Sequence, residues 1–377
     1  METNKEMSAI ARSLKNPYTD DWARRGGKVI GYYCTYIPAE IIHAGGMLPY
    51  RIRATGSTSS ELGDVYTAHT TCTFCRHSLD QAMRGEYHFL DGVVALNSCD
   101  HIRRLYDVWT HGKVQLRDAS FFFHFLSVPI KTDALAVEWL ANEFKRFKSA
   151  LENRFKIAIT DEALSRSIKA YNQKRQLLKS LYELRKQTGP PINGTEILEI
   201  LIAGSSIPVE RFNEFLKEIL EERRNLHISP AYRARLLLSG GELDNPAYVS
   251  LIEELGGQIV TDFLCFGVRD FWELVDEESE PLSALAKRHI HSISCPRMID
   301  YERRGKFIRE LVKEYNVDGI IIQRMKYCDI WGGESARIKF ETKKEGIPCL
   351  VLEREYLMGN VGQMRTRVQA FLETIGR

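Results

Sequence analysis

Hydrophobic and polar positions in the first third of the chain follow two alternating patterns. Short runs rich in β-branched and aromatic residues predict buried strands, and the segments between them carry apolar residues at helical spacing. The predicted strands lie at 28–37, 48–53, 92–96 and 120–129, after a short amphipathic helix near the N-terminus. Because strands alternate with helices, we expect a parallel, doubly wound sheet.

The pattern changes between about residues 133 and 226. Long segments there repeat with a helical period and are interrupted only by the sequence TGPPING at 188–194. Their leucine and aromatic stripes predict core packing, and their charged residues predict solvated faces.

The last third returns to alternating strands and helices, with strands predicted at 234–240, 258–264, 317–323 and 348–353. The predicted fold class is α/β, with two doubly wound parallel-sheet domains of Rossmann or flavodoxin-like type bracketing a helical domain. The predicted boundaries are an N-terminal helical segment at 1–26, a first α/β domain at 27–130, a helical domain at 131–228 and a second α/β domain at 229–377. Two such sheets leave a cleft at their strand ends, where open parallel sheets bind ligands.

Composition excludes some classes of partner. The 377 residues include 52 Lys and Arg against 50 Asp and Glu, so the net charge of +2 provides no basic field for nucleic acid. No segment approaches the ~20 apolar residues needed to span a membrane, and the N-terminus lacks a hydrophobic signal region. We expect a cytoplasmic protein, whose cysteines serve metals or chemistry more often than disulfides.

The positions of the eight cysteines are informative. Cys34 and Cys349 fall inside predicted strands, which favours an interpretation as small buried hydrophobic residues. The other six fall at the ends of predicted strands, at the starts of helices or in a loop, where backbone N–H groups favour thiolates. These six are Cys72, Cys75, Cys99, Cys265, Cys295 and Cys328.

Four interpretations of the six cysteines remain open on spacing alone: zinc, a catalytic thiol, iron–sulfur ligation and plain burial. Only Cys72 and Cys75 form the close pair that structural zinc sites use, which disfavours zinc. A nucleophilic cysteine explains one thiol and leaves five without a role. Iron–sulfur clusters accept thiolates from distant loops, so dispersed cysteines suit them.

Four segments together resemble the 2-hydroxyacyl-CoA dehydratase and benzoyl-CoA reductase family of iron–sulfur proteins. They are KVIGYYCTYIPAEIIHAGGMLPYRI at 28–52, CTFCRHSLDQAMRGEYHFLDGVVALNSCDHIRRL at 72–105, VDGIIIQRMKYCD at 317–329 and GQMRTRVQAFLE at 362–373. The similarity covers nearly the whole chain. It implies one 4Fe-4S cluster held by three cysteines, which at the matching positions are Cys72, Cys99 and Cys328.

The resemblance also implies an ATP-hydrolysing iron–sulfur activator protein that injects electrons at very low potential. The sequence contains no glycine-rich phosphate-binding motif, which is consistent with ATP being bound only by the activator. The expected assembly is a homodimer or a heterodimer with a paralogous subunit, without nucleic acid or membrane.

The chain departs from the three-cysteine pattern through Cys75, Cys265 and Cys295. Double-cubane cluster proteins, a branch of the same family, use six cysteines to hold two cubanes bridged by sulfide, an 8Fe-9S cluster. The resemblance to this branch implies metal ligation by Cys72, Cys75, Cys99, Cys265, Cys295 and Cys328, with Cys75 in the sixth position. The alternative is that the three additional cysteines line the cavity without touching iron.

Three functions follow as hypotheses. The first is a double-cubane reductase of small unsaturated molecules. The second is an acyl-CoA dehydratase or benzoyl-CoA reductase subunit with one cluster, and the third is a non-catalytic electron carrier. Candidate proton donors or substrate contacts are Tyr36, Glu40 and His43 after the first predicted strand, and His101 beside Cys99. For each of these side chains a structural role is the competing interpretation.

Overall fold

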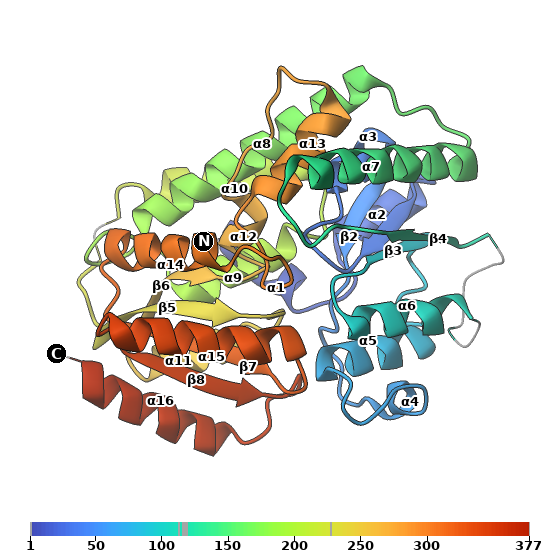
Figure 1. Ribbon diagram of the computed structural model, residues 1–377. Coiled ribbons are helices and arrows are strands. Elements are labelled where there is room, and N and C mark those ends of the chain that lie inside the picture. Colours follow the sequence, from blue (N-terminus) through green and yellow to red (C-terminus); the bar gives the residue numbers. More distant parts are fainter. Residues whose placement is uncertain (1, 112–113, 115–119, 227, 377) are drawn as a thin grey trace.

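Two four-stranded parallel sheets organise the fold (Figure 1). The structure is a computed structural model, and it describes residues 2–111, 114, 120–226 and 228–376. The first sheet has the order β2-β1-β3-β4, with strands at Val29–Tyr32 (β1), Leu48–Arg51 (β2), Gly92–Leu96 (β3) and Phe122–Leu126 (β4). The second has the order β6-β5-β7-β8, with strands at Ala234–Gly240 (β5), Gly257–Phe263 (β6), Gly319–Met325 (β7) and Cys349–Arg354 (β8). The predicted fold class is confirmed, and the domain boundaries stay a prediction.

The helices before and around the first sheet are mostly those that the sequence predicts. They are α1 (Glu2–Ala11), α2 (Pro17–Arg24), α3 (Ala39–Ala44), α4 (Glu61–Asp64), α5 (Thr73–Met83) and α6 (Asp100–Thr110). The sequence predicts one N-terminal helix, but the structure contains two. The second begins because the Asn16 side chain caps it and Pro17 lies in its first turn.

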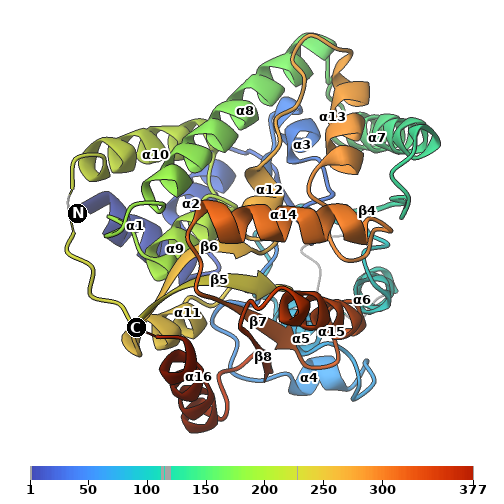
Figure 2. The ribbon, with the colours of Figure 1, turned by 60° about the vertical axis from the view of Figure 1, so that its left-hand side comes forward.

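The middle of the chain is helical, as predicted. Its elements are α7 (Ala134–Phe155), α8 (Asp161–Leu184), α9 (Gly194–Ala203) and α10 (Val209–Arg223). These helices do not form a separate layer: α7 packs on β4, α9 packs on β6 and α1, and α8 packs on α3 and α10. Figure 2 shows α8 crossing above the second sheet toward α3 and α13. The middle helices therefore connect the two sheets.

The second sheet carries α11 (Ala247–Glu254), α12 (Val268–Phe271), α13 (Pro281–His291), α14 (Tyr301–Glu314), α15 (Asp329–Lys344) and α16 (Val361–Ile375). The sequence prediction omits α12 and α13. The helical pattern of the sequence is clear only from Ser335 onward, six residues after α15 begins, because Gly332 and Gly333 obscure it. Among the described helices, none combines the length and apolar character that crossing a membrane requires.

The first predicted strand is too long, and the error concerns a cysteine. Strand β1 ends at Tyr32, where its pairing with β2 and β3 also ends. The chain then turns, and the Ile37 N–H donates a 3.0 Å hydrogen bond to the Cys34 carbonyl before Pro38 caps α3. Cys34 therefore lies past the carboxyl end of the strand and not inside it.

Arg53 ties the first sheet to the N-terminal and middle helices. Its fully buried guanidinium donates hydrogen bonds to the carbonyls of Ile10 (3.0 Å), Ser13 (2.6 Å) and Ile202 (2.9 Å). One buried cation thus links three segments of the chain. Without it, the carbonyls of the other two segments would be buried without hydrogen-bond donors, which lowers the stability of the fold.

We expect Arg53→Met to lower the free energy of unfolding by about 3 kcal/mol, because the apolar stem survives while buried carbonyls lose their donor. Chemical denaturation followed by circular dichroism measures the effect. Arg12→Met is the matched control, since Arg12 is two-thirds exposed and its ion pair with Glu199 contributes less than about 1 kcal/mol. Equal stability losses in the two variants would contradict this account of Arg53.

Candidate functional site

Three cysteines occupy the same structural position at the starts of three helices. Cys72, Cys99 and Cys328 are the N-cap residues of α5, α6 and α15. Two of these helices belong to the first half of the chain, and the third follows β7 of the second half. All three side chains pack against one buried cluster, so the fold brings the expected 4Fe-4S ligands to a common place.

The two halves of the chain touch at this place. Figures 1 and 2 both draw α5 beside α15, and the Thr73 hydroxyl at the start of α5 donates a 2.9 Å hydrogen bond to the Met325 sulfur at the end of β7. Nearby, the Ala54 N–H (2.9 Å) and the Tyr356 hydroxyl (2.8 Å) both donate to the Asp244 carboxylate. These contacts fix the cleft between the sheets.

A second group of thiols lies in the same cleft. Cys34 follows β1, Cys265 follows β6, and Cys295 lies in the loop between α13 and α14. Cys34 and Cys295 pack against one apolar cluster, and the Cys295 N–H donates a 3.1 Å hydrogen bond to the Tyr36 hydroxyl, two residues from Cys34. Sequence reasoning missed Cys34 as a cleft residue.

Cys265 is held between the two halves. Its thiol donates a hydrogen bond of 3.1 Å to the Glu242 carboxylate, and its carbonyl accepts a 2.7 Å hydrogen bond from Arg51. Arg51 also pairs with Glu242 at 3.1 Å. Burial, reinforced by the Glu242 charge, raises the pKa of Cys265 to about 12.

Electrostatic coupling indicates that the two thiol groups adjoin. Burial, together with the charges of Cys72 and Cys34, raises the pKa of Cys99 to about 12, although the N–H groups at the start of α6 oppose the increase. Burial also raises the pKa of Cys328, with added repulsion from Cys72, Cys99 and Cys295. Thiolate repulsion at this range favours a positively charged group among the sulfurs.

Three buried arginines supply positive charge around the second group of thiols. Arg51, Arg269 and Arg297 are each at most 9% exposed, and the Nε atom of each has no hydrogen-bond partner among the described residues. Burial lowers the pKa of Arg269, but the charges of Cys295 and Cys265 outweigh it and raise the pKa overall. A buried cation with an unused donor is costly unless an anion lies nearby, so the cleft is suited to an anionic group.

The residues present are compatible with an iron–sulfur cluster. Within the described residues, no three Cys, His, Asp or Glu side chains converge closely enough to hold one metal ion. A cluster presents a separate coordination position on each iron, so its thiols do not have to converge on one point. Thiols at helix N-termini, close to buried arginines, match the donor set and the negative charge of such a cluster.

The candidate proton donors separate into two pairs. His101 lies at the site, because its Nδ1 accepts a 3.2 Å hydrogen bond from the Cys72 N–H, and the interaction with the Cys72 sulfur raises the pKa of the imidazole. Tyr36 contacts Cys295 as described, and burial raises the pKa of its hydroxyl, which therefore keeps its proton. Tyr36, Cys295 and Arg269 line one small cavity.

Glu40 and His43 make contacts that favour structural roles. Glu40 forms a buried ion pair with Arg175 of α8. Burial alone raises the pKa of Glu40, but the charges of Arg175, His289 and Arg288 outweigh it and lower the pKa to about 2, so Glu40 has no proton to donate at neutral pH. His43 bonds Ser167 of α8 at 2.9 Å and Glu210 of α10 at 3.1 Å.

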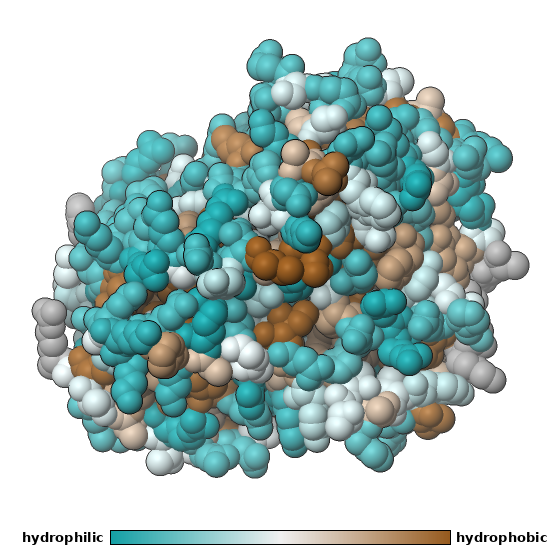
Figure 3. All heavy atoms as spheres, in the orientation of Figure 1, coloured by the Kyte–Doolittle hydropathy of each residue, from teal (hydrophilic) through white to brown (hydrophobic). Residues whose placement is uncertain are grey.

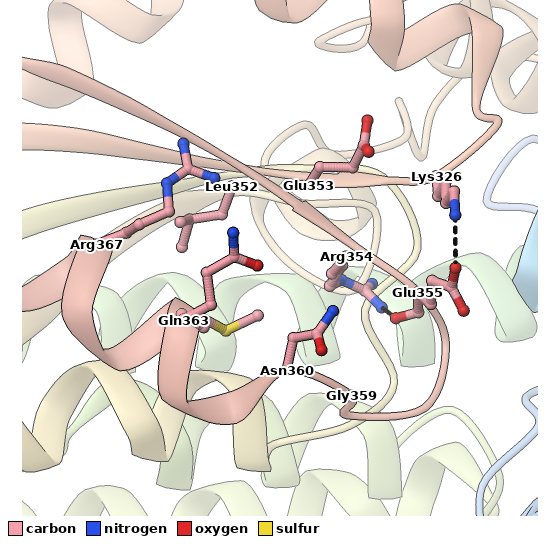
Figure 4. A pocket seen from close by; sticks show the side chains of 10 residues that line it. Lys326, Leu352, Glu353, Arg354, Glu355, Gly359, Asn360, Gln363 and Arg367 are labelled. Carbon is pink, nitrogen blue, oxygen red and sulfur yellow. Dashed lines mark hydrogen bonds and ion pairs between the residues drawn. The ribbon is translucent and has the colours of Figure 1, made fainter.

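A larger pocket lies between β8 and α16 (Figure 4) and carries no sulfur ligands beyond a methionine. Its charged side chains already have partners: Lys326 pairs with Glu355 at 2.9 Å, and Arg367 donates to the Val351 carbonyl at 2.7 Å. We therefore take the cysteine cleft, and not this pocket, as the candidate site.

Comparison with known proteins assigns the chain to a family. The family model of the 2-hydroxyglutaryl-CoA dehydratase D-component matches residues 34–375. The chain belongs to this family. Because the match begins at Cys34 and ends near the C-terminus of the chain, it includes every cysteine of the cleft.

Curated relatives resemble the chain over nearly its whole length. The (R)-phenyllactyl-CoA dehydratase beta subunit of Clostridium sporogenes is 26% identical over 93% of this chain and 92% of its own. One of the benzoyl-CoA reductase subunits from Thauera aromatica is 26% identical over 92% of this chain and 91% of its own length. The (R)-2-hydroxyglutaryl-CoA dehydratase subunit beta of Acidaminococcus fermentans is 23% identical over 100% of this chain and 98% of its own length. Each is named as a subunit of a dehydratase or reductase, so an enzymatic role is indicated for this family member.

The Glu40–Arg175 pair predicts a pH-dependent contribution to stability. The pKa of Glu40 falls from its ordinary 4.5 in the unfolded chain to about 2 in the folded chain. The pair therefore stabilises fully above about pH 5, and its contribution is lost as the pH falls through 4.5 toward 2. We expect Glu40→Gln to lower the melting temperature at pH 7, with the difference from wild type shrinking toward pH 3.

Thermal unfolding of both proteins between pH 3 and pH 7 measures this difference. Glu214→Gln is the control, because Glu214 pairs with Arg211 on an exposed helix face and contributes little. A pH-independent difference between wild type and Glu40→Gln would show that the pair does not act through the ionised carboxylate.

Proposed function

We propose that this chain carries out low-potential, one-electron reductions at iron–sulfur clusters held in the cysteine cleft, with electrons from a separate ATP-hydrolysing iron–sulfur activator. The observation that carries the proposal is the set of three cysteine N-caps, on helices from both halves of the chain, next to three further thiols. When bound, such clusters supply single electrons that open routes unavailable to two-electron chemistry.

The thiols divide into two sets of three. Cys72, Cys99 and Cys328 share one apolar cluster and would hold the first cubane. Cys34, Cys265 and Cys295 lie around the buried arginines and would hold the second, which makes an 8Fe-9S double cubane with a non-protein bridge. In this proposal Cys34 takes the sixth position that sequence reasoning gave to Cys75.

Cys34 replaces Cys75 in the proposed ligand set because of where each side chain lies. Cys34 lies past the end of a strand and adjoins Cys295 through Tyr36. Cys75 is 2% exposed within the first turn of α5, where the surrounding apolar cluster encloses its side chain. A strand-end thiol is free to reach a bound group, whereas a thiol inside a helix is limited by the helix.

The remaining residues would prepare the cleft for reduction. Arg51, Arg269 and Arg297 offset the negative charge of the clusters in a region that excludes water. The Tyr36 hydroxyl holds a proton beside the cavity at Cys295, and the raised pKa of His101 favours a proton on its imidazole, at Nε2 while Nδ1 accepts from the Cys72 N–H. These two groups are the proton donors that we propose for a reduced substrate, which for a double cubane is a small unsaturated molecule.

A second candidate function is that of an acyl-CoA dehydratase or benzoyl-CoA reductase subunit with one 4Fe-4S cluster. The observation that favours it is the names of the three relatives, each of which refers to a CoA thioester. In that case Cys72, Cys99 and Cys328 alone would bind iron, and the other cleft thiols would line the cleft without binding it.

Exposed hydrophobic side chains support a partner subunit. Ile299 (59% exposed) donates its N–H to the Ile130 carbonyl (residue 48% exposed), and Trp139 (53%) and Tyr301 (51%) lie near the starts of α7 and α14, the helices that follow these two residues in the chain. Figure 3 shows hydrophobic side chains gathered in the middle of one face. Exposed apolar residues that lie together commonly mark an interface, which a second copy or a paralogous subunit would cover.

Anaerobic reconstitution followed by iron and acid-labile sulfide analysis tests the proposal. We expect about eight irons per chain, and about four after Cys34→Ser, because the second cubane loses a ligand. Cys75→Ser keeps about eight irons, and Cys349→Ser, at the start of β8, is the matched control.

Other results would redirect or end the proposal. About four irons in the wild type would favour the single-cluster acyl-CoA subunit. Unchanged iron after Cys34→Ser with loss after Cys75→Ser would restore Cys75 to the ligand set. A wild-type chain that stays free of iron would contradict both functions, and electron transfer without substrate turnover would indicate a carrier.

A further inference from the structure

Cys72 and Cys75 occupy two positions of a helix whose side chains meet. Cys72 is the N-cap of α5 and Cys75 is its third residue. In a capping box the side chains at these two positions reach across the first turn. Both side chains also pack in the same apolar cluster, so the two thiols share the first turn of α5.

This arrangement is specific to one of the three cysteine N-caps. The third residue of α6, after Cys99, is Ile102, and the third residue of α15, after Cys328, is Trp331. Cys99 and Cys328 therefore lack a thiol partner on their own helix. Cluster ligation by a cysteine at a helix start therefore does not require the second thiol of α5.

The two thiols differ in the way that attacking and resolving thiols differ. Cys72 is partly exposed, with His101 and the amide groups of the first turn around it, and Cys75 is buried. A disulfide from solution can therefore reach Cys72, whereas Cys75, which is 2% exposed, is reached only by the sulfur of Cys72 on the same turn.

We propose that Cys72 and Cys75 form a reversible intrachain disulfide when the cleft is free of metal, with Cys72 as the attacking thiol and Cys75 as the resolving thiol. The oxidant is a low-molecular-weight disulfide such as oxidised glutathione. The Cys72 thiolate attacks one sulfur of the oxidant, which forms a mixed disulfide and releases one thiolate.

The Cys75 sulfur, after giving up its proton to solvent, then attacks the Cys72 sulfur. The Cys72–Cys75 bond forms, the mixed disulfide breaks and a second thiolate leaves. In total the protein dithiol loses two electrons and two protons, and the oxidant gains them as two thiols. A reductant of the same class reverses both steps.

The disulfide removes Cys72 from the cleft thiols and stores it in a form that stronger oxidants attack less readily. This protective consequence rests on the proposed function, because it assumes that Cys72 binds iron when reduced. Formation of the disulfide itself does not depend on any cluster.

The test uses the full-length, metal-free chain in glutathione buffers of graded redox ratio, followed by alkylation and trypsin digestion. The tryptic peptide at 54–76 contains Cys72 and Cys75 and no other cysteine. We expect this peptide to lose both alkylation sites under oxidising conditions and to regain both on reduction. In Cys75→Ser, Cys72 accumulates as the glutathione adduct, and in Cys72→Ser, Cys75 stays a free thiol.

Circular dichroism confirms that each variant is folded, and Cys349→Ser is the control. Alkylation of both cysteines under oxidising conditions, or a glutathione adduct on Cys75 in Cys72→Ser, would overturn the proposal. The iron content of the reduced chain separates the two claims. Iron loading without the disulfide contradicts only this inference, whereas the disulfide without iron loading contradicts only the proposed function.

Discussion

The structure depends on the convergence of helix N-termini at the junction of two parallel sheets. In each sheet the carboxyl ends of the strands point the same way, so the loops and helix starts that follow them gather at one edge. Contacts such as Thr73 with Met325 and Arg51 with Glu242 hold the two edges against each other. The amide groups at the starts of α5, α6 and α15 then face a shared space, and cysteines at those positions face it too.

The same convergence determines the electrostatics of the cleft. Thiols buried near one another repel when they ionise, which keeps most of them protonated in the absence of a positively charged group. Helix N-termini and three buried arginines reduce the cost of negative charge but leave unused donors. A bound iron–sulfur cluster would use both features, since its irons attract the thiolates and its overall charge matches the arginines.

Much of this arrangement could be predicted from the sequence, for identifiable reasons. Cys99 and Cys328 follow short apolar runs and precede helices, so their place at the sheet edge follows from the hydrophobic pattern. Cys34 could not be placed in this way, because the apolar run continues unbroken to Ile37, although ten residues is long for a strand and Pro38 limits it. The partner of Glu40 was also beyond prediction, since Arg175 is 135 residues away and nothing local specifies the pair. Patterns along the chain predict where elements end, whereas pairing between elements requires the folded structure.

The central claim is that the cleft cysteines hold iron in two sets of three. A crystal structure of the anaerobically reconstituted protein, with anomalous scattering recorded at the iron absorption edge, tests it most directly. The account predicts iron density in two adjoining positions, one among Cys72, Cys99 and Cys328 and one among Cys34, Cys265 and Cys295, with the Cys75 sulfur unbound. Iron bound by Cys75 in place of Cys34, or iron outside the cleft, would contradict it.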